Sequence, residues 1–113
     1  MGTESAFNTL SFEITFPWDN DTVYIANIYP YTYTDLCEYI DELTNHSLYK
    51  DCLRKEVLCK SIAGNDCVML TITNFEGNHE EIERREVIVL SARVHPGENV
   101  SSFVIEGVIG YLL

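Results

Sequence analysis

A histidine and a glutamate stand three residues apart in the segment ARVHPGENVSS, residues 92–102, directly after a run of apolar residues. The imidazole of His95 and the carboxylate of Glu98 are both good ligands for zinc. Proline restricts the backbone after His95, whereas Gly97 can adopt an unusual φ that would bring Glu98 round to the same ion. On spacing alone two explanations stay open: a metal site, or an ordinary turn with a hydrogen-bonded histidine, which is the more frequent of the two.

The elements that flank this segment are those of an α/β protein. Four consecutive apolar residues open the segment 87–94 and predict a strand that is buried on both faces in the middle of a sheet. After the turn, apolar residues recur at helical spacing and predict a helix from Ser101 or Ser102 onward. A strand, a loop and a helix in this order favour a functional site, because the carboxyl ends of strands open into a crevice.

Two hairpins are predicted upstream of this unit. Residues 10–16 alternate apolar and polar side chains, and residues 22–29 are rich in β-branched and aromatic residues, so together they predict a first hairpin. Strands at 56–62 and 66–75 flank a turn that contains Gly64 and predict a second hairpin.

One helix and one charged loop complete the expected elements. Thr34 is the expected N-cap of a helix that begins at Asp35, and its apolar face carries Leu36, Tyr39, Ile40 and Leu43. The segment 77–86 has a single apolar residue, which indicates a solvated loop. His79 within this loop is expected to be exposed rather than to bind metal.

Composition and charge exclude several classes of function. The chain has 113 residues, of which 46% are hydrophobic, enough for one modest domain with a core. Its formal net charge of −11 argues against general electrostatic binding to nucleic acid or to an anionic membrane. No apolar run approaches the roughly 20 residues that span a bilayer, and no signal peptide is evident, so the cytosol is expected. The four cysteines form no C-x-x-C pair, and we expect them to be reduced thiols.

Three segments resemble one enzyme family. ARVHPGE, followed by two serines and an apolar helix, resembles the zinc-binding segment of the cytosolic carboxypeptidases, M14 metallocarboxypeptidases that remove glutamates from tubulin and other proteins. YPYTYTDL, residues 29–36, resembles the junction between the β-sandwich and catalytic domains of that family. Residues 57–73 resemble its first catalytic hairpin. The family usually has Thr-Asn and a tryptophan where this chain has Asn99, Val100 and Phe103.

The resemblance implies a fold and a metal site. His95 and Glu98 fall on the first two zinc ligands of the family, so the implied cofactor is Zn²⁺. The implied fold class is α/β, a mixed β-sheet with flanking helices. Residues 31–113 would be the incomplete start of a zinc carboxypeptidase domain, and residues 1–30 the C-terminal end of a β-sandwich domain. The third ligand, the general base and the arginine and asparagine that bind substrate follow the matched region in the family, so no catalytic residue is expected within this chain.

The implied function is a zinc-dependent metallocarboxypeptidase that removes C-terminal amino acids from proteins, with glutamate, as in tubulin deglutamylation, foremost. The chain would be a fragment of that enzyme and inactive alone. The expected partner is a protein or peptide C-terminus, with tubulin as the candidate; nucleic acid and membrane are not expected. The expected location is the cytosol, with microtubules as the candidate site of association. The alternative is a non-catalytic fragment or pseudoenzyme that binds other proteins.

Overall fold

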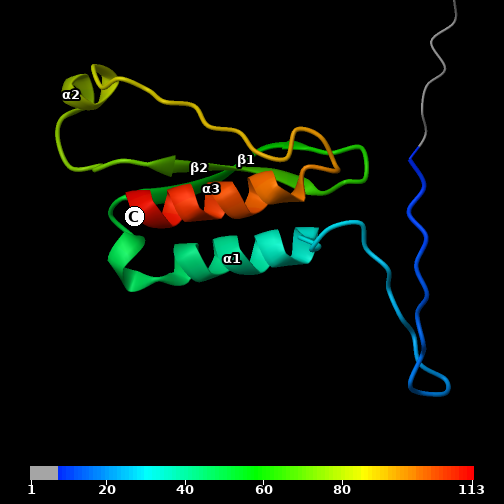
Figure 1. Cartoon of the computed structure of the whole chain (residues 1–113). Coiled ribbons are helices and arrows are strands. Elements are labelled where there is room, and N and C mark those ends of the chain that lie inside the picture. The colour runs from blue at the N-terminus through cyan, green and yellow to red at the C-terminus, as the bar shows by residue number, and fades with distance from the viewer. Residues whose placement is uncertain (1–7) are drawn as a thin grey trace, which may run out of the picture.

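The computed structural model describes residues 8–113, which form a β-hairpin, two long helices and two shorter helical segments (Figure 1). Their order is α1 (Tyr33–Asn45), η1 (Ser47–Tyr49), β1 (Leu53–Lys60), β2 (Asp66–Ile72), α2 (His79–Glu83) and α3 (Asn99–Leu112). The expected combination of helices and strands is therefore confirmed. The sheet differs from the prediction, because over the described residues it has two antiparallel strands rather than a mixed set.

The hairpin of β1 and β2 confirms the second predicted hairpin. The strands pair from Leu53 opposite Ile72 to Lys60 opposite Asp66. Gly64 adopts a φ of +83° in the turn, a conformation that costs glycine little because it has no Cβ. The turn is closed by a hydrogen bond from Ser61 N to Asn65 O at 2.8 Å.

Helix α1 forms where the periodicity predicts a helix, but it begins earlier. Its N-cap is Thr32, not Thr34: Thr32 Oγ1 accepts from Asp35 N at 3.1 Å, and Asp35 Oδ2 accepts from Thr32 N at 2.6 Å. This reciprocal pair is a capping box, and it sets the start of the helix because Asp35 lies three residues after the cap. Of the predicted apolar face, Ile40 and Leu43 are buried, and Leu36 and Tyr39 are half-buried.

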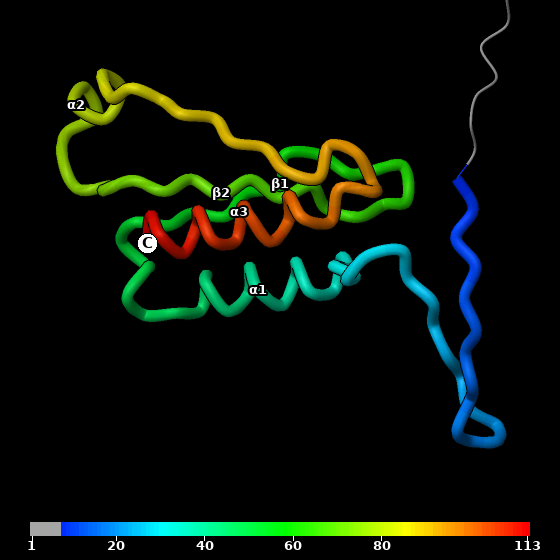
Figure 2. Tube along the Cα trace, in the orientation of Figure 1, coloured from blue at the N-terminus to red at the C-terminus, as the bar shows by residue number. Residues whose placement is uncertain are grey.

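Helices α1 and α3 lie side by side and run in the same direction, with the hairpin next to them (Figures 1 and 2). The ring of Tyr31 meets Phe103 edge-on, with the two centroids 5.1 Å apart. Lys55 of β1 contacts Asp41 of α1 at 2.9 Å, which ties the helix to the sheet. Within residues 8–113 the buried core is small and consists of four hydrophobic side chains: Tyr31, Ile40, Leu43 and Leu53.

Three predicted strands are absent from the described part of the chain. Residues 10–16, 22–29 and 87–94 carry no strand, and Val89 in the last of these is 85% exposed. An apolar or alternating pattern predicts which side chains a strand would bury. A strand also needs a neighbouring strand with which its backbone forms hydrogen bonds, and the pattern does not provide one. Figure 2 shows residues 8–25 lying apart from the helices and the hairpin, whereas the ring of Tyr29 lies near Phe103 of α3, with the two centroids 5.9 Å apart. The assignment of residues 1–30 to a β-sandwich remains a prediction, and residues 1–7 lie outside the described part.

The charged segment 77–86 is partly helical instead of a loop. Asn78 caps α2 through its side chain, whose Oδ1 accepts from Glu81 N at 2.9 Å. Glu80 and Glu81 lie in the first turn, where the helix dipole favours negative charge. His79 is exposed, as predicted, and its ring lies 3.2 Å from the carboxylate of Glu83. Over residues 8–113, no helix is long and apolar enough to cross a membrane.

Candidate metal centre

The turn before α3 is built by backbone hydrogen bonds and by one residue with a positive φ. Glu98 N donates to His95 O at 3.1 Å and closes the turn over Pro96 and Gly97. Gly97, which can adopt an unusual φ, does not have a positive one here, whereas Arg93 has a φ of +59°. Because a non-glycine residue seldom adopts this conformation without compensation, the hydrogen bonds around Arg93 must stabilise it.

The two predicted ligand residues are brought together by this turn. His95 Nδ1 and Glu98 Oε1 lie 2.8 Å apart, and both side chains face solvent, 74% and 55% exposed. Glu98 is also the N-cap of α3, yet its side chain makes no capping hydrogen bond to the helix. Its carboxylate contacts His95 instead. One imidazole nitrogen and one carboxylate are therefore adjacent and accessible from solvent.

Arg93 connects this turn to both long helices. Its Nε donates to Pro96 O at 2.8 Å, and its Nη1 donates to Tyr31 O at 3.2 Å and to Ser102 Oγ at 3.3 Å. Its backbone N donates to Ser101 Oγ at 2.8 Å. A guanidinium presents its donors in a rigid planar fork, so these contacts fix the turn relative to the start of α1 and the start of α3.

Ser101 and Asn99 add two further contacts at the same place. Ser101 Oγ donates to Glu98 O at 2.6 Å, and Asn99 Nδ2 donates to Tyr29 O at 3.2 Å. The sequence predicted the ligand pair but missed these supporting residues. The only signal for them was the presence of Arg93 and the two serines beside the motif.

A third ligand does not join the pair from the part of the chain that the structure describes. No group of three or more His, Cys, Asp or Glu side chains able to hold a metal is found in residues 8–113. His46 accepts a hydrogen bond from Leu48 N and stacks on Tyr49, and His79 pairs with Glu83 on α2. Within residues 8–113 the turn therefore brings together two potential donors, whereas a catalytic zinc generally takes three protein ligands.

A carboxylate from α3 lies among tyrosines at the contact between the two long helices. Tyr31 Oη donates to Glu106 Oε1 at 2.5 Å, and Tyr39 Oη donates to Glu106 O at 3.0 Å. Burial, together with the hydrogen bond and the charge of Glu106, raises the pKa of Tyr31 well above its ordinary value. Tyr31 thus contacts both Glu106 and Arg93. These contacts stabilise the pair of helices, α1 and α3, that positions the turn.

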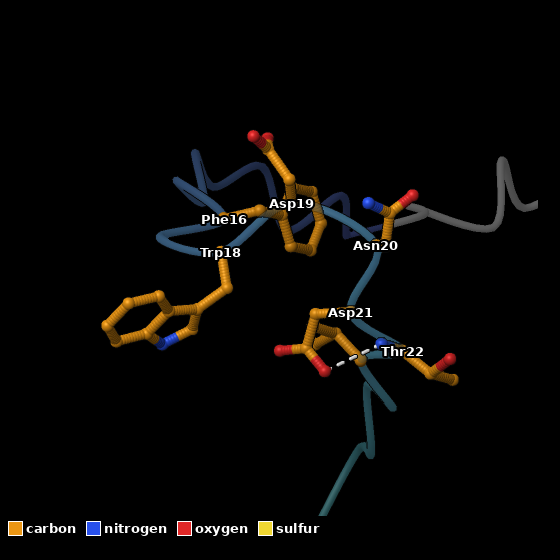
Figure 3. Close-up of a pocket in the computed structure, with 7 residues that line it drawn as sticks. Phe16, Trp18, Asp19, Asn20, Asp21 and Thr22 are labelled. Atoms are coloured by element: carbon orange, nitrogen blue, oxygen red, sulfur yellow. Dashed lines mark hydrogen bonds between the residues drawn. The ribbon is translucent and has the colours of Figure 1, made fainter.

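A separate hollow lies at the bend between residues 10–16 and 22–29 (Figure 3). It is lined by Phe16, Trp18, Asp19, Asn20, Asp21, Thr22 and Val23. Asp21 Oδ1 accepts from Thr22 N at 2.7 Å, so this carboxylate is engaged in the bend itself. Trp18 points into solvent and is 74% exposed. The hollow includes none of the residues of the His95–Glu98 turn.

Curated relatives match almost the whole chain. It is 41% identical over 110 residues to cytosolic carboxypeptidase 2 of Homo sapiens, covering 97% of this chain and 12% of the relative. It is 41% identical over 105 residues to cytosolic carboxypeptidase 3 of Bos taurus, covering 93% of this chain and 10% of that relative. It is 39% identical over 114 residues to cytosolic carboxypeptidase 1 of Homo sapiens, covering 96% of this chain and 9% of that relative.

The match is confined to one segment of each relative, since the chain spans only 12%, 10% and 9% of their lengths. No family model matches the chain, and no solved structure matches it. The matched region contains the hairpin, both long helices and the His95–Glu98 turn. Over nearly its whole length, the chain therefore belongs to the family of the cytosolic carboxypeptidases.

Proposed function

We propose that this chain contributes two ligands, His95 and Glu98, to the metal centre of a zinc-dependent metallocarboxypeptidase. The observation that carries the proposal is the 2.8 Å contact between His95 Nδ1 and Glu98 Oε1 on an exposed turn. The turn lies within a sequence that is 41% identical to a protein named cytosolic carboxypeptidase 2.

The residues of the turn suit zinc. Nitrogen and carboxylate oxygen bind Zn²⁺ at about 2.0–2.2 Å, so two donor atoms this close can both reach one ion. Both side chains are accessible, and the backbone that carries them is held by Arg93. When bound, zinc would polarise the scissile carbonyl and lower the pKa of a water ligand. The role of this chain is to hold and orient that ion.

The remaining parts of the reaction are proposed to come from other parts of a longer protein. These parts are the third ligand, the general base and the groups that bind the substrate's terminal carboxylate. The relatives are long enough to contain these parts outside the matched segment, because the segment is 12% of human cytosolic carboxypeptidase 2. We accordingly propose that the chain alone has no carboxypeptidase activity.

The proposed substrate is a protein or peptide with C-terminal glutamate, with tubulin as the candidate, and the proposed location is the cytosol. An acidic substrate needs cations near the site, and Arg93 is the nearest along the sequence. Its guanidinium already donates to Pro96 O, Tyr31 O and Ser102 Oγ. The positive charge that selects glutamate must therefore be supplied by residues other than Arg93.

Zinc binding tests the ligand assignment directly. Titration of the chain with Zn²⁺ should give weak binding, reduced at least about tenfold by His95→Ala or Glu98→Gln, since each change removes a donor. His79→Ala is the matched control, because His79 and Glu83 form a second exposed His–Glu pair, 3.2 Å apart. An equal loss in the control would show that zinc binds at scattered surface pairs rather than at the turn.

Activity tests the wider proposal. Release of glutamate from a short peptide would be followed with this chain and with a longer protein that contains the segment, each with added zinc and with a chelator. We expect turnover in the longer protein alone, and its loss in His95→Ala. A longer protein that binds zinc yet releases no amino acid would favour the alternative, a non-catalytic module that binds partners. The many exposed apolar side chains of this chain suit that alternative.

A further inference from the structure

Two cysteines lie directly opposite each other near the end of the hairpin. Cys59 of β1 is the register partner of Cys67 of β2, and both are free and exposed. They are eight positions apart in the sequence, a spacing that by itself does not indicate a pair. The pairing depends on the irregularity between Val57 and Cys59, which shifts the register by one residue.

The hairpin holds this pair at a separation that suits a disulfide. Directly opposed residues of antiparallel strands have Cα atoms about 4.5–5.5 Å apart, and disulfides need about 4.4–6.8 Å. The next residues toward the turn, Lys60 and Asp66, form an ion pair, and the Ser61 N to Asn65 O hydrogen bond closes the turn. The adjacent bulge increases the local twist of the strand.

The two thiols lie on the outer face of the hairpin. On the inner face, Lys55 contacts Asp41 of α1, and Asp66 and Val68 of β2 line one hollow together with Ile40 of α1. Side chains alternate along a strand, so Cys67, next to Asp66, points away from α1. An oxidant can therefore reach the pair from solvent.

We propose that Cys59 and Cys67 form a reversible redox site, a dithiol that a peroxide converts to an intramolecular disulfide. The Cys59 thiolate attacks the peroxide, releasing one water or alcohol and leaving a sulfenic acid. The Cys67 sulfur then attacks that sulfenic sulfur, expelling water and closing the S–S bond. Two thiols thus lose two protons and two electrons to one peroxide, and a cellular dithiol or glutathione restores them.

The two thiols are in contact, and a hydrogen bond with Cys59 raises the pKa of the Cys67 thiol. The resolving role is assigned to Cys67. A transient disulfide of this kind is the form usually found in reducing compartments, where structural disulfides are rare. The proposal is independent of the metal site and stands whether or not the chain belongs to an active peptidase.

The experiment treats the reduced chain with hydrogen peroxide at low protein concentration and maps its cysteines by mass spectrometry after alkylation. The expected product is about 2 Da lighter, with one bond between Cys59 and Cys67, and dithiothreitol reverses it. In Cys67→Ser, which lacks the resolving thiol, dimedone should trap a sulfenic acid on Cys59. Cys37→Ser and Cys52→Ser should leave the bond unchanged, because both thiols are half-buried elsewhere.

A face-swapped variant is the matched control. Cys67→Ser combined with Val68→Cys moves the thiol to the face toward α1 and should abolish the bond, while circular dichroism checks that the fold is kept. A bond to Cys37 or Cys52, a disulfide-linked dimer, or no bond at all in the wild-type chain would overturn the proposal. A bond from the new cysteine to Cys59, formed at the wild-type rate, would also overturn it, since the pairing would then reflect flexibility rather than register; a bond to Cys37, which lines the same hollow as Val68, would not count.

Discussion

At the scale of single residues, Arg93 shows how a site can depend on a side chain that touches neither ligand. It adopts a φ of +59°, and its guanidinium reaches Pro96, Ser102 and the carbonyl of Tyr31. A left-handed conformation costs a non-glycine residue of order 1 kcal/mol or more, and these hydrogen bonds offset the cost. Arg93 is therefore a positioning residue for the His95–Glu98 turn.

Substitution of Arg93 should weaken zinc binding without removing a ligand. We expect Arg93→Ala to raise the dissociation constant for zinc about 10–100-fold, the usual effect of losing support around a metal ligand. Arg93→Lys should recover only part of the loss, because an ammonium cannot donate in the same planar fork. Calorimetric titration measures both dissociation constants, and Arg84→Ala, at the C-cap of α2, is the control for the lost charge. Full affinity in Arg93→Ala would exclude the positioning role.

Tyr31 gives a pH dependence with a defined sign. Burial and the contact with Glu106 raise the pKa of Tyr31 in the folded chain above its unfolded value of about 10. The folded state thus holds the proton more tightly, so this contribution to stability is complete below about pH 10 and is lost as the pH rises further. We expect the unfolding midpoint in urea to fall above that pH.

The control for this prediction is Tyr31→Phe. It should lower the free energy of unfolding by about 1.5–3 kcal/mol at pH 7, because it removes a hydrogen bond to a carboxylate. It should also reduce the loss of stability above pH 10. Tyr111→Phe, at an exposed tyrosine of α3, should change neither quantity. An alkaline transition of equal size in wild type and Tyr31→Phe would contradict the assignment.

At the scale of elements, α1 is specified by local chemistry at its N-terminus and by packing along its length. The reciprocal contacts between Thr32 and Asp35 satisfy two backbone N–H groups that would otherwise lack partners. Ile40 and Leu43 then bury one face. Tyr31 directly precedes the N-cap of this helix, and its carbonyl accepts a hydrogen bond from Arg93. The position at which α1 begins therefore affects the geometry of the His95–Glu98 turn.

The N-cap can be tested against a neighbouring threonine. Thr32→Ala should destabilise the chain by about 0.5–2 kcal/mol, because it removes the side-chain oxygen of the cap. Thr34→Ala, at the second residue of α1, should change the free energy of unfolding by no more than about 0.5 kcal/mol, as substitutions at exposed helical positions usually do. Urea denaturation followed by circular dichroism compares the two. A larger effect at Thr34 would restore the cap position that the sequence first suggested.

At the scale of the whole molecule, the chain is far from compact. Its radius of gyration is 20.5 Å, whereas a compact domain of this length has about 13 Å. Large apolar side chains of the segments 10–29 and 87–94 are exposed, among them Trp18, Ile25 and Val89. Exposed apolar side chains in this number favour association with other protein molecules, because burying apolar surface away from water is favourable.

The isolated chain is therefore expected to self-associate. Light scattering coupled to size exclusion should show species larger than a monomer at micromolar concentration, and the chain should bind the dye ANS. Charge-introducing changes at Val87 and Val89 together should reduce both signals, whereas Val104→Lys alone should have a smaller effect, because it adds charge outside the extended segments. A monodisperse monomer with a radius of gyration of about 13 Å would show that these segments fold back onto the core.

The sequence by itself determined those features that depend on neighbours along the chain. The alternating strands around Gly64 predicted the second hairpin, and helical periodicity predicted α1 and α3. The spacing of His95 and Glu98 within one tight turn predicted that their side chains would lie close together. Their role as zinc ligands stays a prediction. Periodicity and turn chemistry act over a few residues, so they can be recognised without knowing how the elements pack.

Only the tertiary structure decided which distant residues meet. Arg93 reaches Tyr31 across 62 positions and Glu106 reaches Tyr31 across 75, contacts that exist because α1 and α3 lie side by side. Cys59 lies opposite Cys67 because of a bulge in β1, which cannot be predicted from the pattern of apolar and polar residues. Tertiary structure also decided that no strand forms at residues 87–94. The apolar side chains there favour burial, but a strand must pair with a neighbouring strand, and none lies beside this segment within residues 8–113.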